Sequence, residues 1–404
     1  MLTVKELKDI QGKVIFCRVD FNVPQKDGVI RDNNRIVAAL PTIQELIGKG
    51  ARVVLLSHLG KVKHKEGPEA VEAAKKKNNL AIAAPALAEL LGKEVKFCPE
   101  TRGETLKSMV AELNDGDVLL VQNTRYEKGE EKNDPELAGA WAELADGFVM
   151  DAFGSAHRAH ASTVGLPSLL KEAGKPVAVG YLVEKEVANL TRCVEVKDDD
   201  RPYIAILGGF KVSDKIKVID ALLKKCDKIL IGGAMAYTFN KALVAEIGTS
   251  PCEDAQLEYA RKCFEEAKGR IILPIDSKCA DAFEDWTTLT TTQDKNIPEG
   301  YEGMDIGPKT IKLFTDEIKK AKMVFWNGPM GVFEKSEFTQ GTVAVCEACA
   351  SLKNAFTVCG GGDSAAAVKQ FGFKDKFSHV STGGGASLEM IENDGHLPGI
   401  DVLK

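Results

Sequence analysis

The stretch MDAFGSAHRAHAST, residues 150–163, places two histidines and one arginine within four positions of a chain that has only six histidines. These residues are His157, Arg158 and His160, and they follow directly after an apolar run. Such side chains can bind an anion or transfer a proton. A metal site is the weaker interpretation, because no other ligand is spaced to join the two histidines. A lone histidine is more often structural than catalytic, so the interpretation depends on what gathers around this stretch.

Further polar and basic residues lie at or near the ends of other apolar runs in the first half of the chain. They are Asp20, Asn22, Arg35, His58, Lys61, Asn123 and Arg125. Arginine presents a planar fork that matches phosphate and carboxylate, and Asp20 and Asn22 can accept from or donate to hydroxyl groups. The sequence therefore predicts a small, anionic, hydroxylated ligand for this half.

The second half instead places glycines after its apolar runs. Five segments, LGGFKVSDK, IGGAMAYTF, NGPMGVFE, GGGDSAAA and STGGGASLE, are each expected to close a strand and open a helix. Glycine lets the backbone approach a ligand, and the N–H groups at the start of a helix favour phosphate. One such turn is ordinarily plain connection chemistry, whereas five together favour a nucleotide site. No G-x-x-x-x-G-K-[ST] or G-x-G-x-x-G motif occurs, so neither a P-loop nor a dinucleotide site is predicted.

Charged residues among these turns could bind the phosphates. Lys211 and Lys215 are four residues apart, so they would share one helix face if the helix begins there. A solvated helix end is the alternative interpretation. Asp363 follows three glycines, where a carboxylate could hold Mg²⁺ bound to nucleotide phosphates, and it could equally cap the helix.

The elements that must position these residues are runs rich in Val, Ile, Leu and Phe, separated by helix-like segments. Continuous apolar strands that alternate with helices indicate parallel sheets covered on both faces, in a doubly wound (Rossmann-like) α/β architecture. Ligands bind at the carboxyl ends of such strands. The runs occupy residues 13–23, 51–58, 117–123, 147–153, 202–209, 228–233, 270–276, 323–328, 356–362 and 378–384.

The runs fall into an early and a late set, and a chain of 404 residues exceeds the size at which one core stops growing. Two domains are therefore expected. Between the sets, Val183, Val187, Leu190 and Val194 repeat at helical spacing, which predicts a linking helix that ends before the acidic, proline-containing KDDDRP. We expect the domain boundary near residues 183–200.

Composition excludes several classes of protein. The net charge of −6 argues against nucleic acid as a main partner, and no apolar run is long enough to span a bilayer. The first residues lack the apolar region of a secretory signal, so a cytoplasmic location is expected. Ten cysteines without an export signal indicate reduced, mostly buried thiols. The one close pair, Cys346 and Cys349, lies in a predicted helix with no further ligand to complete a zinc site.

These motifs closely resemble the phosphoglycerate kinase family over essentially the whole chain. The resemblance is carried, in order, by RVDFNVP, SHLG, NTRY, DAFGSAHRAHAS, GYLVEKE, KVSDKI, GGAMAYTF, DIGPKT, NGPMGVFE, GGGDS, STGGGASLE and LPGI. It implies a two-domain hinge enzyme of glycolysis that reversibly moves the acyl phosphate of 1,3-bisphosphoglycerate to Mg-ADP, giving 3-phosphoglycerate and ATP. Residues 1–183, with the tail 395–404 packed back on them, would bind phosphoglycerate, and residues 184–394 would bind nucleotide, beginning with a hinge helix around Glu186.

The resemblance also implies a role for each site residue. The catalytic cations would be Arg35, Lys211 and Lys215. Phosphoglycerate would be bound by Asp20, Asn22, Arg35, His58, Lys61, Arg125, His157 and Arg158. Nucleotide would be bound by Gly209, Lys211, Lys215, Gly233, Asn327, Pro329, Glu334, Gly361, Gly362, Asp363 and Ser364, with Asp363 holding Mg²⁺ through the nucleotide. The glycines 383, 384 and 385 (Gly383, Gly384, Gly385) would lie near the transferring group. The histidine-arginine cluster is then an anion-binding wall, and a monomer without nucleic-acid or membrane partners is expected.

Several positions depart from the common pattern of that family. Lys61 stands where arginine is frequent, Phe210 where a small residue is usual, and Ala234 where glycine is often found. Gln122 and Tyr126 replace Glu and Phe. The alternatives are a non-catalytic nucleotide or phosphometabolite sensor, a protein that only retains the fold, and an NAD-dependent dehydrogenase. The retained cations, the intact glycine turns and the missing dinucleotide motif argue against them in turn.

Overall fold

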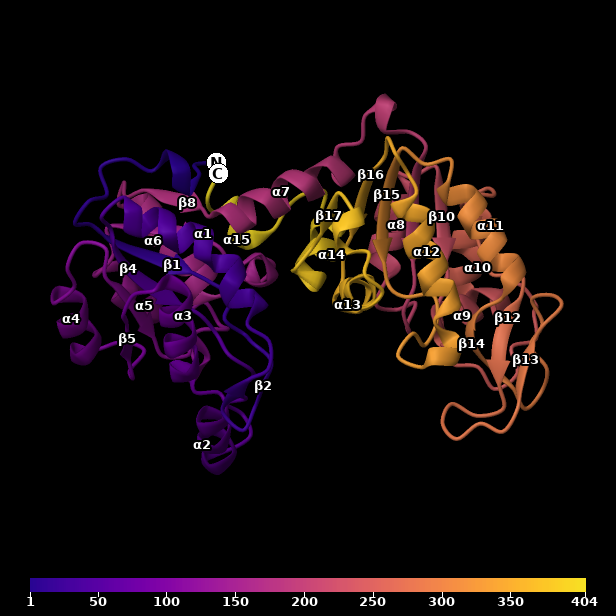
Figure 1. The fold of residues 1–404 in the computed structure, drawn as a ribbon, viewed down its shortest axis with the longest axis horizontal. Helices are drawn as coiled ribbons and strands as arrows, with labels where there is room; N and C mark the ends of the chain where they lie inside the picture. Colours follow the sequence, from indigo (N-terminus) through magenta and orange to yellow (C-terminus); the bar gives the residue numbers. More distant parts are fainter. The chain divides into compact units, whose positions relative to one another are not determined.

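The computed structural model describes residues 1–404 and divides into two compact units. Unit 1 comprises Met1–Ala188 and His396–Lys404, and unit 2 comprises Asn189–Gly395. Each unit contains a six-stranded sheet, and helix α7 (Tyr181–Val194) begins in the first unit and ends in the second (Figure 1). No helix in either unit combines the length and the apolar character needed to cross a bilayer.

The sheet of unit 1 is parallel throughout, with the strand order β5-β6-β4-β1-β7-β8. Its central strands are fully buried because they are continuous apolar runs covered on both faces. The strands are β1 (Val14–Arg18), β4 (Arg52–Leu56), β5 (Val95–Cys98), β6 (Val118–Val121), β7 (Gly147–Met150) and β8 (Val177–Val179). A short antiparallel hairpin, β2 (Gln25–Lys26) and β3 (Val29–Ile30), lies outside the sheet.

Alternate residues of these strands face opposite sides of the sheet. On one side, Ile15 and Cys17 of β1 pack into a core with apolar residues of α1 and α3. The helices of unit 1 are α1 (Asn34–Gly48), α2 (Pro68–Lys77), α3 (Ala83–Leu91), α4 (Glu104–Ala111), α5 (Pro135–Ala142), α6 (Leu166–Glu172), the first part of α7, and α15 (Pro398–Asp401). Helix α15 brings Ile400 and Leu403 into the buried interior of unit 1 from the far end of the chain.

The sheet of unit 2 is also parallel, with the order β11-β10-β9-β15-β16-β17. Its strands are β9 (Tyr203–Leu207), β10 (Lys228–Ile231), β11 (Ile271–Ile272), β15 (Met323–Asn327), β16 (Phe356–Cys359) and β17 (His379–Val380). Its helices are α8 (Ile216–Leu223), α9 (Met235–Ala242), α10 (Leu257–Glu266), α11 (Pro308–Ile318), α12 (Gln340–Ala350), α13 (Gly362–Gln370) and α14 (Gly384–Glu392). The predicted doubly wound α/β fold is confirmed in both units.

Each of the ten predicted strands is present, but the sequence reasoning missed a second kind of sheet. Strands β12 (Ser277–Ala280), β13 (Leu289–Thr291) and β14 (Glu302–Ile306) form an antiparallel sheet in the order β13-β12-β14. Strand β13 is half exposed and polar, so it lacks the apolar run on which the prediction depended. Strands β5 and β8 were also missed: Lys96 interrupts the apolar run of β5, which is only partly buried, and β8 has three residues.

All ten cysteines are free thiols, and nine of them are buried. Cys346 and Cys349 both lie in helix α12, where burial raises their pKa values, to about 12 for Cys346. No cluster of histidine, cysteine or acidic residues suited to a metal ion exists in the structure. The predicted helix is confirmed, and both thiols are buried in it.

Candidate active site

The strand orders identify where ligands should bind in each unit. In unit 1 the chain runs outward from β1 through β4 and then returns to β7 on the other side of β1. In unit 2 it runs outward from β9 through β10 and returns to β15. We call the place where the chain reverses direction beside the first strand the switch point. A crevice opens there, beyond the carboxyl ends of the two strands. The residues that follow β1, β7, β9 and β15 are the ones singled out from the sequence.

Asp20 and Asn22 follow β1 and are held in a defined geometry. Asp20 forms an ion pair with Arg35, at the start of α1, and its Oδ1 accepts from the amide of Asn22 at 3.1 Å. The Oδ1 of Asn22 accepts in turn from the amide of Gly60, which precedes Lys61, at 2.8 Å. Arg35 and Lys61 remain exposed, so both can reach a ligand from solvent. The structure thus gathers four of the predicted residues.

A buried arginine that the sequence reasoning did not select supports this group from below. Arg18, the last residue of β1, is 1% exposed. Its guanidinium donates to Ser162 Oγ at 2.8 Å and contacts His58 Nδ1 at 3.0 Å. Burial and the nearby Arg18 lower the pKa of His58 well below its usual value, so the imidazole is neutral at physiological pH. A charged residue within an apolar strand was the signal that could have identified Arg18.

The acidic residues balance this positive charge. Burial raises the pKa of Asp20, but the positive charges of Arg35 and Arg18 and the hydrogen bond from Asn22 N–H hold that pKa below its ordinary value. Glu130 is fully buried, and its Oε1 accepts from the amide of Ser162 at 2.8 Å. The unit therefore fixes its cations through buried acceptors before any ligand arrives.

Arg125 is oriented by backbone groups on the neighbouring strand end. Its Nη1 donates to the carbonyl of Gly60 at 2.7 Å, and its buried Nε has no hydrogen-bond partner. Asn123, fully buried, accepts from the amides of Leu59 and Arg125 and donates to the carbonyl of Leu59. Asn123 thus ties the two loops together, and Arg125 retains hydrogen-bonding capacity for a ligand.

Residues 151–160, which contain the histidine-arginine cluster, form a turn after β7. Arg158 is exposed, and its amide and carbonyl are held by Ser155 and Thr163, at 3.1 and 2.6 Å. His160 is 7% exposed, and burial lowers its pKa. His157 and Arg158 thus lie on the turn beyond β7, at the switch point with β1. No hydrogen bond or ion pair joins Arg158 to the Asp20 group.

In unit 2 the carboxyl edge is made of backbone. A Cβ at Gly233 would lie 2.6 Å from the amide nitrogen of Gly209 and 3.0 Å from the carbonyl oxygen of Pro329. Gly209 and Gly233 have φ values of 105° and 67°, which favour glycine. The loops after β9, β10 and β15 therefore touch through main-chain atoms, which leaves a floor that a ligand can approach closely.

A second cluster of hydrogen-bonded residues lies at the carboxyl ends of β15 and β16. The ammonium of Lys215 contacts Asn327 Oδ1, and Asn327 Nδ2 donates to the carbonyl of Gly360 at 2.8 Å. Ser364 Oγ accepts from the amide of Gly328 at 2.6 Å. Burial lowers the pKa of Lys215 to about 8. A Cβ at Gly384 would lie 2.9 Å from the amide nitrogen of Gly362, so the loop at 383–385 adjoins this group.

The predicted geometry of the two lysines is wrong. Helix α8 begins at Ile216, and Lys211 and Lys215 lie in the irregular segment before it, so they share no helix face. Lys215 is largely buried, whereas Lys211 is exposed. Glu253, not selected from the sequence, holds this segment by accepting from the amides of Val212 and Ser213, at 2.5 and 3.2 Å.

Asp363 lies in the first turn of α13, whose N-cap is Gly361, so Asp363 does not cap the helix. It is exposed. Mg²⁺ in phosphate-transfer sites is commonly held by one or two carboxylates together with substrate phosphates. A single exposed carboxylate beside a helix N-terminus fits that donor set, and a site made by protein ligands alone is absent. Glu334 is likewise exposed and lies in the long loop between β15 and α12. The prediction that this segment opens directly into a helix is wrong, because α12 begins only at Gln340.

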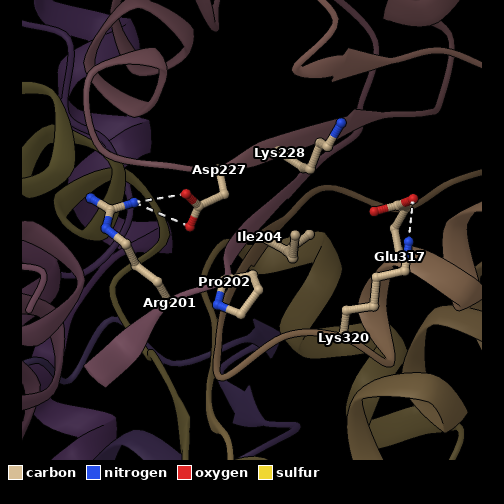
Figure 2. Close-up of a pocket in the computed structure, with 7 residues that line it drawn as sticks. All are labelled: Arg201, Pro202, Ile204, Asp227, Lys228, Glu317 and Lys320. Carbon is tan, nitrogen blue, oxygen red and sulfur yellow. Dashed lines mark hydrogen bonds and ion pairs between the residues drawn. The ribbon is translucent and has the colours of Figure 1, made fainter. Parts of the chain in front are cut away.

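A separate cavity of about 440 Å³ lies at the opposite end of the unit 2 sheet. It is lined by Arg201, Pro202, Ile204, Asp227, Lys228, Glu317 and Lys320 (Figure 2). Arg201 pairs with Asp227 at 3.1 Å and Lys320 with Glu317 at 3.0 Å, as Figure 2 shows. Two of the three cations thus pair with the two carboxylates, and Lys228 Nζ donates to the carbonyl of Gly269 at 3.2 Å, so each charged group that lines the cavity has a partner within the protein.

The departures from the family pattern divide into two kinds. Gln122 and Tyr126 are structural: Gln122 accepts from the amide of Leu80 at 3.0 Å, and the Tyr126 hydroxyl donates to the carbonyl of Lys75. Ala234 adopts ordinary helical angles at the start of α9, where glycine is not required. Phe210, by contrast, is 64% exposed next to Gly209 and Lys211, in the segment that could contact a ligand.

Comparisons with known proteins agree over the whole chain. The family model described as phosphoglycerate kinase matches residues 4–394. A phosphoglycerate kinase of Staphylococcus haemolyticus is 52% identical over 399 residues, which cover 98% of this chain and 97% of that protein. A solved phosphoglycerate kinase structure from Coxiella burnetii is 38% identical, with a TM-score of 0.86 over 100% of this chain and 98% of that one. A second, from Pyrococcus horikoshii, is 32% identical, with a TM-score of 0.83 over the same shares.

Proposed function

The chain belongs to the phosphoglycerate kinase family, and from that premise we propose how its residues divide the work of the reaction. It is a glycolytic phosphotransferase, which reversibly moves the acyl phosphate of 1,3-bisphosphoglycerate to ADP and gives 3-phosphoglycerate and ATP. No comparison favours a non-catalytic sensor. We assign phosphoglycerate to the first domain (residues 1–183 with 395–404) and nucleotide to the second (residues 184–394).

The assignment of phosphoglycerate rests on the prearranged cations of unit 1. Arg125 keeps an Nε without a hydrogen bond, 3.6 Å from Glu131 Oε1, and Arg35, Lys61 and Arg158 are exposed near the carboxyl ends of the strands. Arginine binds phosphate and carboxylate through paired N–H groups, while Asp20 and Asn22 supply partners for a hydroxyl group. Neutral His58 is suited to hydrogen bonding rather than to proton transfer from an imidazolium. His157 completes the wall on the turn after β7.

The assignment of nucleotide rests on the glycine-lined edge of unit 2. The main-chain contacts among Gly209, Gly233 and Pro329 form a floor without side chains, which suits a nucleoside, and we assign Asn327, Glu334, Gly361, Gly362 and Ser364 to its border. Helices α13 and α14 both begin with glycine, so their N-termini favour phosphate groups. We propose that Asp363 holds Mg²⁺ bound to the nucleotide. When bound, this ion would neutralise charge on the phosphate oxygens.

The chemistry needs no nucleophilic side chain or general base. An acyl phosphate is already an activated donor: an oxygen of the terminal phosphate of ADP attacks phosphorus, and the carboxylate of 3-phosphoglycerate leaves. The protein must position the substrates and neutralise charge on the transferring oxygens. We assign that role to Arg35, Lys211 and Lys215, with the amides of Gly383, Gly384 and Gly385 near the transferring group. Because the two substrates are assigned to different units, transfer requires hinge closure about α7, which also excludes water.

The observation that carries the proposal is the contact of Lys215 with Asn327 at the β9/β15 switch point, beside the Ser364 and Gly361 loop. This lysine, whose pKa is lowered to about 8 and which is still charged at pH 7, supports the assignment of phosphates to this edge. The test is a coupled assay of acyl-phosphate formation from 3-phosphoglycerate and Mg-ATP, with Lys211→Ala as the control. Turnover by the wild type and severe loss in the control would support the assignment, whereas nucleotide binding without turnover would contradict it.

We further propose that the protein acts in the cytoplasm as a monomer, without nucleic-acid or membrane partners. The net charge of −6 supports the absence of a nucleic-acid partner. Sedimentation of the purified protein in the presence and absence of both substrates would test the monomeric state.

A further inference from the structure

The start of the linking helix α7 is held in an unusual way. A helix leaves its first N–H groups without intrahelical partners, and these are normally capped by the side chain just before the helix. The residue before α7 is Gly180, which has no side chain. The amides are instead satisfied by residues that are distant in sequence. Tyr181 N–H donates to Thr42 Oγ1 at 2.9 Å, and Leu182 N–H donates to Asp151 Oδ1 at 3.1 Å.

Asp151 is the centre of this arrangement. It is fully buried at the end of β7, and its own amide donates to the carbonyl of Arg18 at 2.8 Å. Burial raises the pKa of this carboxyl, and the neighbouring Thr42 hydroxyl and Val183 N–H act in the opposite direction. A Cβ at Gly180 would overlap the Asp151 carboxyl and the Thr42 hydroxyl. The glycine at this position is therefore required because Asp151 occupies the space of the missing cap.

The neighbouring contacts extend the same anchor. Gly180 N–H donates to the carbonyl of Met150 at 2.8 Å, and the Tyr181 hydroxyl donates to Glu45 Oε2 at 3.0 Å. The first turn of α7 is thus bonded to both α1 and β7, and it belongs to the rigid part of unit 1. The last turn is bonded within unit 2, where the carbonyls of Cys193 and Val194 accept from Tyr203 and Lys225, at 3.1 and 3.0 Å.

Asp151 also begins the turn that carries His157 and Arg158. One residue therefore fixes both the turn assigned to phosphoglycerate and the direction in which the linking helix leaves unit 1. We propose that Asp151 is a positioning residue for phosphoryl transfer. With Thr42 and Gly180, it fastens α7 to unit 1, so that the linking helix and the turn that carries His157 and Arg158 move together when the two units close. This inference rests on the proposed function, because it supposes that the two substrates bind to different units.

The chemistry of the carboxyl determines which variants are informative. Asp151 Oδ2 has no hydrogen-bond partner, and burial raises the pKa of Asp151 to about 8. Asn has the shape of a neutral carboxyl and keeps an acceptor oxygen, so Asp151→Asn should preserve the anchor. Asp151→Ala removes the acceptor, and Gly180→Ala leaves Asp151 in the chain but crowds its carboxyl and displaces the start of α7.

Unit 2 provides a matched control. Asp276 is fully buried and accepts from the amides of Lys309 and Thr310, at 2.9 and 2.8 Å, at the start of α11. The residue before that helix is again a glycine, Gly307, whose Cβ would overlap the Asp276 carboxyl. Asp276→Ala and Gly307→Ala therefore remove the same kind of cap from a helix that does not link the units.

The experiment compares these variants as full-length proteins in three measurements. They are turnover, the dissociation constant of Mg-ADP alone, and the contraction in small-angle scattering on adding 3-phosphoglycerate and Mg-ADP, which cannot react together. Asp151→Ala and Gly180→Ala should lower kcat about tenfold and reduce the contraction, with the dissociation constant of Mg-ADP unchanged. Asp151→Asn should keep the wild-type kcat and the wild-type contraction. The Asp276 and Gly307 variants should lose thermal stability but keep the wild-type kcat and contraction.

The outcomes separate this inference from the proposed function. If the wild type neither turns over nor contracts, the proposed function itself fails. If the wild type does both, but Gly180→Ala closes and turns over normally, the positioning role of Asp151 is overturned. Equal losses in the Asp276 and Asp151 variants would also overturn it, because the effect would then be one of general stability. Should Asp151→Ala fail to fold, the Gly180→Ala and Gly307→Ala pair decides the question.

Discussion

At the carboxyl edge of the unit 1 sheet, ligand-binding groups are side chains, whereas at the same edge of the unit 2 sheet they are largely backbone. In unit 1, Asp20 pairs with exposed Arg35, and half-buried Arg125 is held by the buried Asn123 and the carbonyl of Gly60. In unit 2, glycines bring three loops into main-chain contact, and Lys215 is the one cation drawn into the interior beside them. Two sheets of the same architecture thus present different surfaces, which is why we assign a different anion to each. A compact, hydroxylated anion suits charged side chains, and an extended nucleotide suits a floor without side chains.

The largest effect is expected when an exposed cation is removed from unit 1. Arg35→Ala should lower kcat by about 100-fold, because it removes charge neutralisation in the transition state. The dissociation constant of Mg-ADP should be unchanged, since the nucleotide is assigned to unit 2. Steady-state kinetics and calorimetry would measure the two quantities. Equal losses in turnover and nucleotide affinity would remove Arg35 from its catalytic role.

A change in the backbone floor of unit 2 should have the opposite signature. Gly233→Ala places a Cβ 2.6 Å from the amide nitrogen of Gly209, at a φ of 67° that disfavours other residues. The variant should lose roughly 1–3 kcal/mol of unfolding free energy through overpacking. Its affinity for Mg-ADP should fall about tenfold while that for 3-phosphoglycerate stays constant. Gly362→Ala, where the Cβ would meet nothing within 4 Å, is the control for stability.

The buried lysine predicts a pH dependence that only unit 2 should show. The pKa of Lys215 is lowered to about 8, so the side chain is charged at pH 7 and becomes neutral as the pH rises through about 8. Affinity for Mg-ADP should therefore fall above pH 8, by at most about tenfold per pH unit for this one group. Lys215→Arg, which stays charged, should flatten the profile. A fall of the same steepness in the arginine variant would show that another group is responsible.

The smallest effect is expected for Lys61 of unit 1, on the binding of 3-phosphoglycerate. Lys61 follows the turn fixed by Asn22 and Gly60, where a lysine keeps the charge but cannot form paired hydrogen bonds. Lys61→Arg should tighten the binding of 3-phosphoglycerate by about threefold or less, since exposed charge contacts contribute little. Titration at low and high salt would measure this difference. Weaker binding in the arginine variant would show that the loop geometry requires the lysine.

The sequence predicted most of the architecture because the central strands are uninterrupted apolar runs. It could not predict β13, whose residues are polar and half exposed, or the antiparallel sheet to which β13 belongs. At the site, the positions of Asp20, Asn22 and Arg125 follow from their place after strands. Arg18, Glu130 and Glu253 were missed because their role depends on partners far along the chain, such as Ser162 for Arg18. Lys211 and Lys215 were misplaced because the first helical residue cannot be inferred from lysine spacing alone.

The packing of helix α15 has a consequence for the order in which the protein folds. Residues His396–Lys404 belong to unit 1, where Gly399 N–H donates to the carbonyl of Ala156 at 2.8 Å and Ile400 is 1% exposed. These residues follow the whole of unit 2 in the chain. During synthesis on a ribosome, the unit that emerges first therefore stays incomplete until the second has been translated. The turn that includes Ala156 gains its contact with α15 only at that stage.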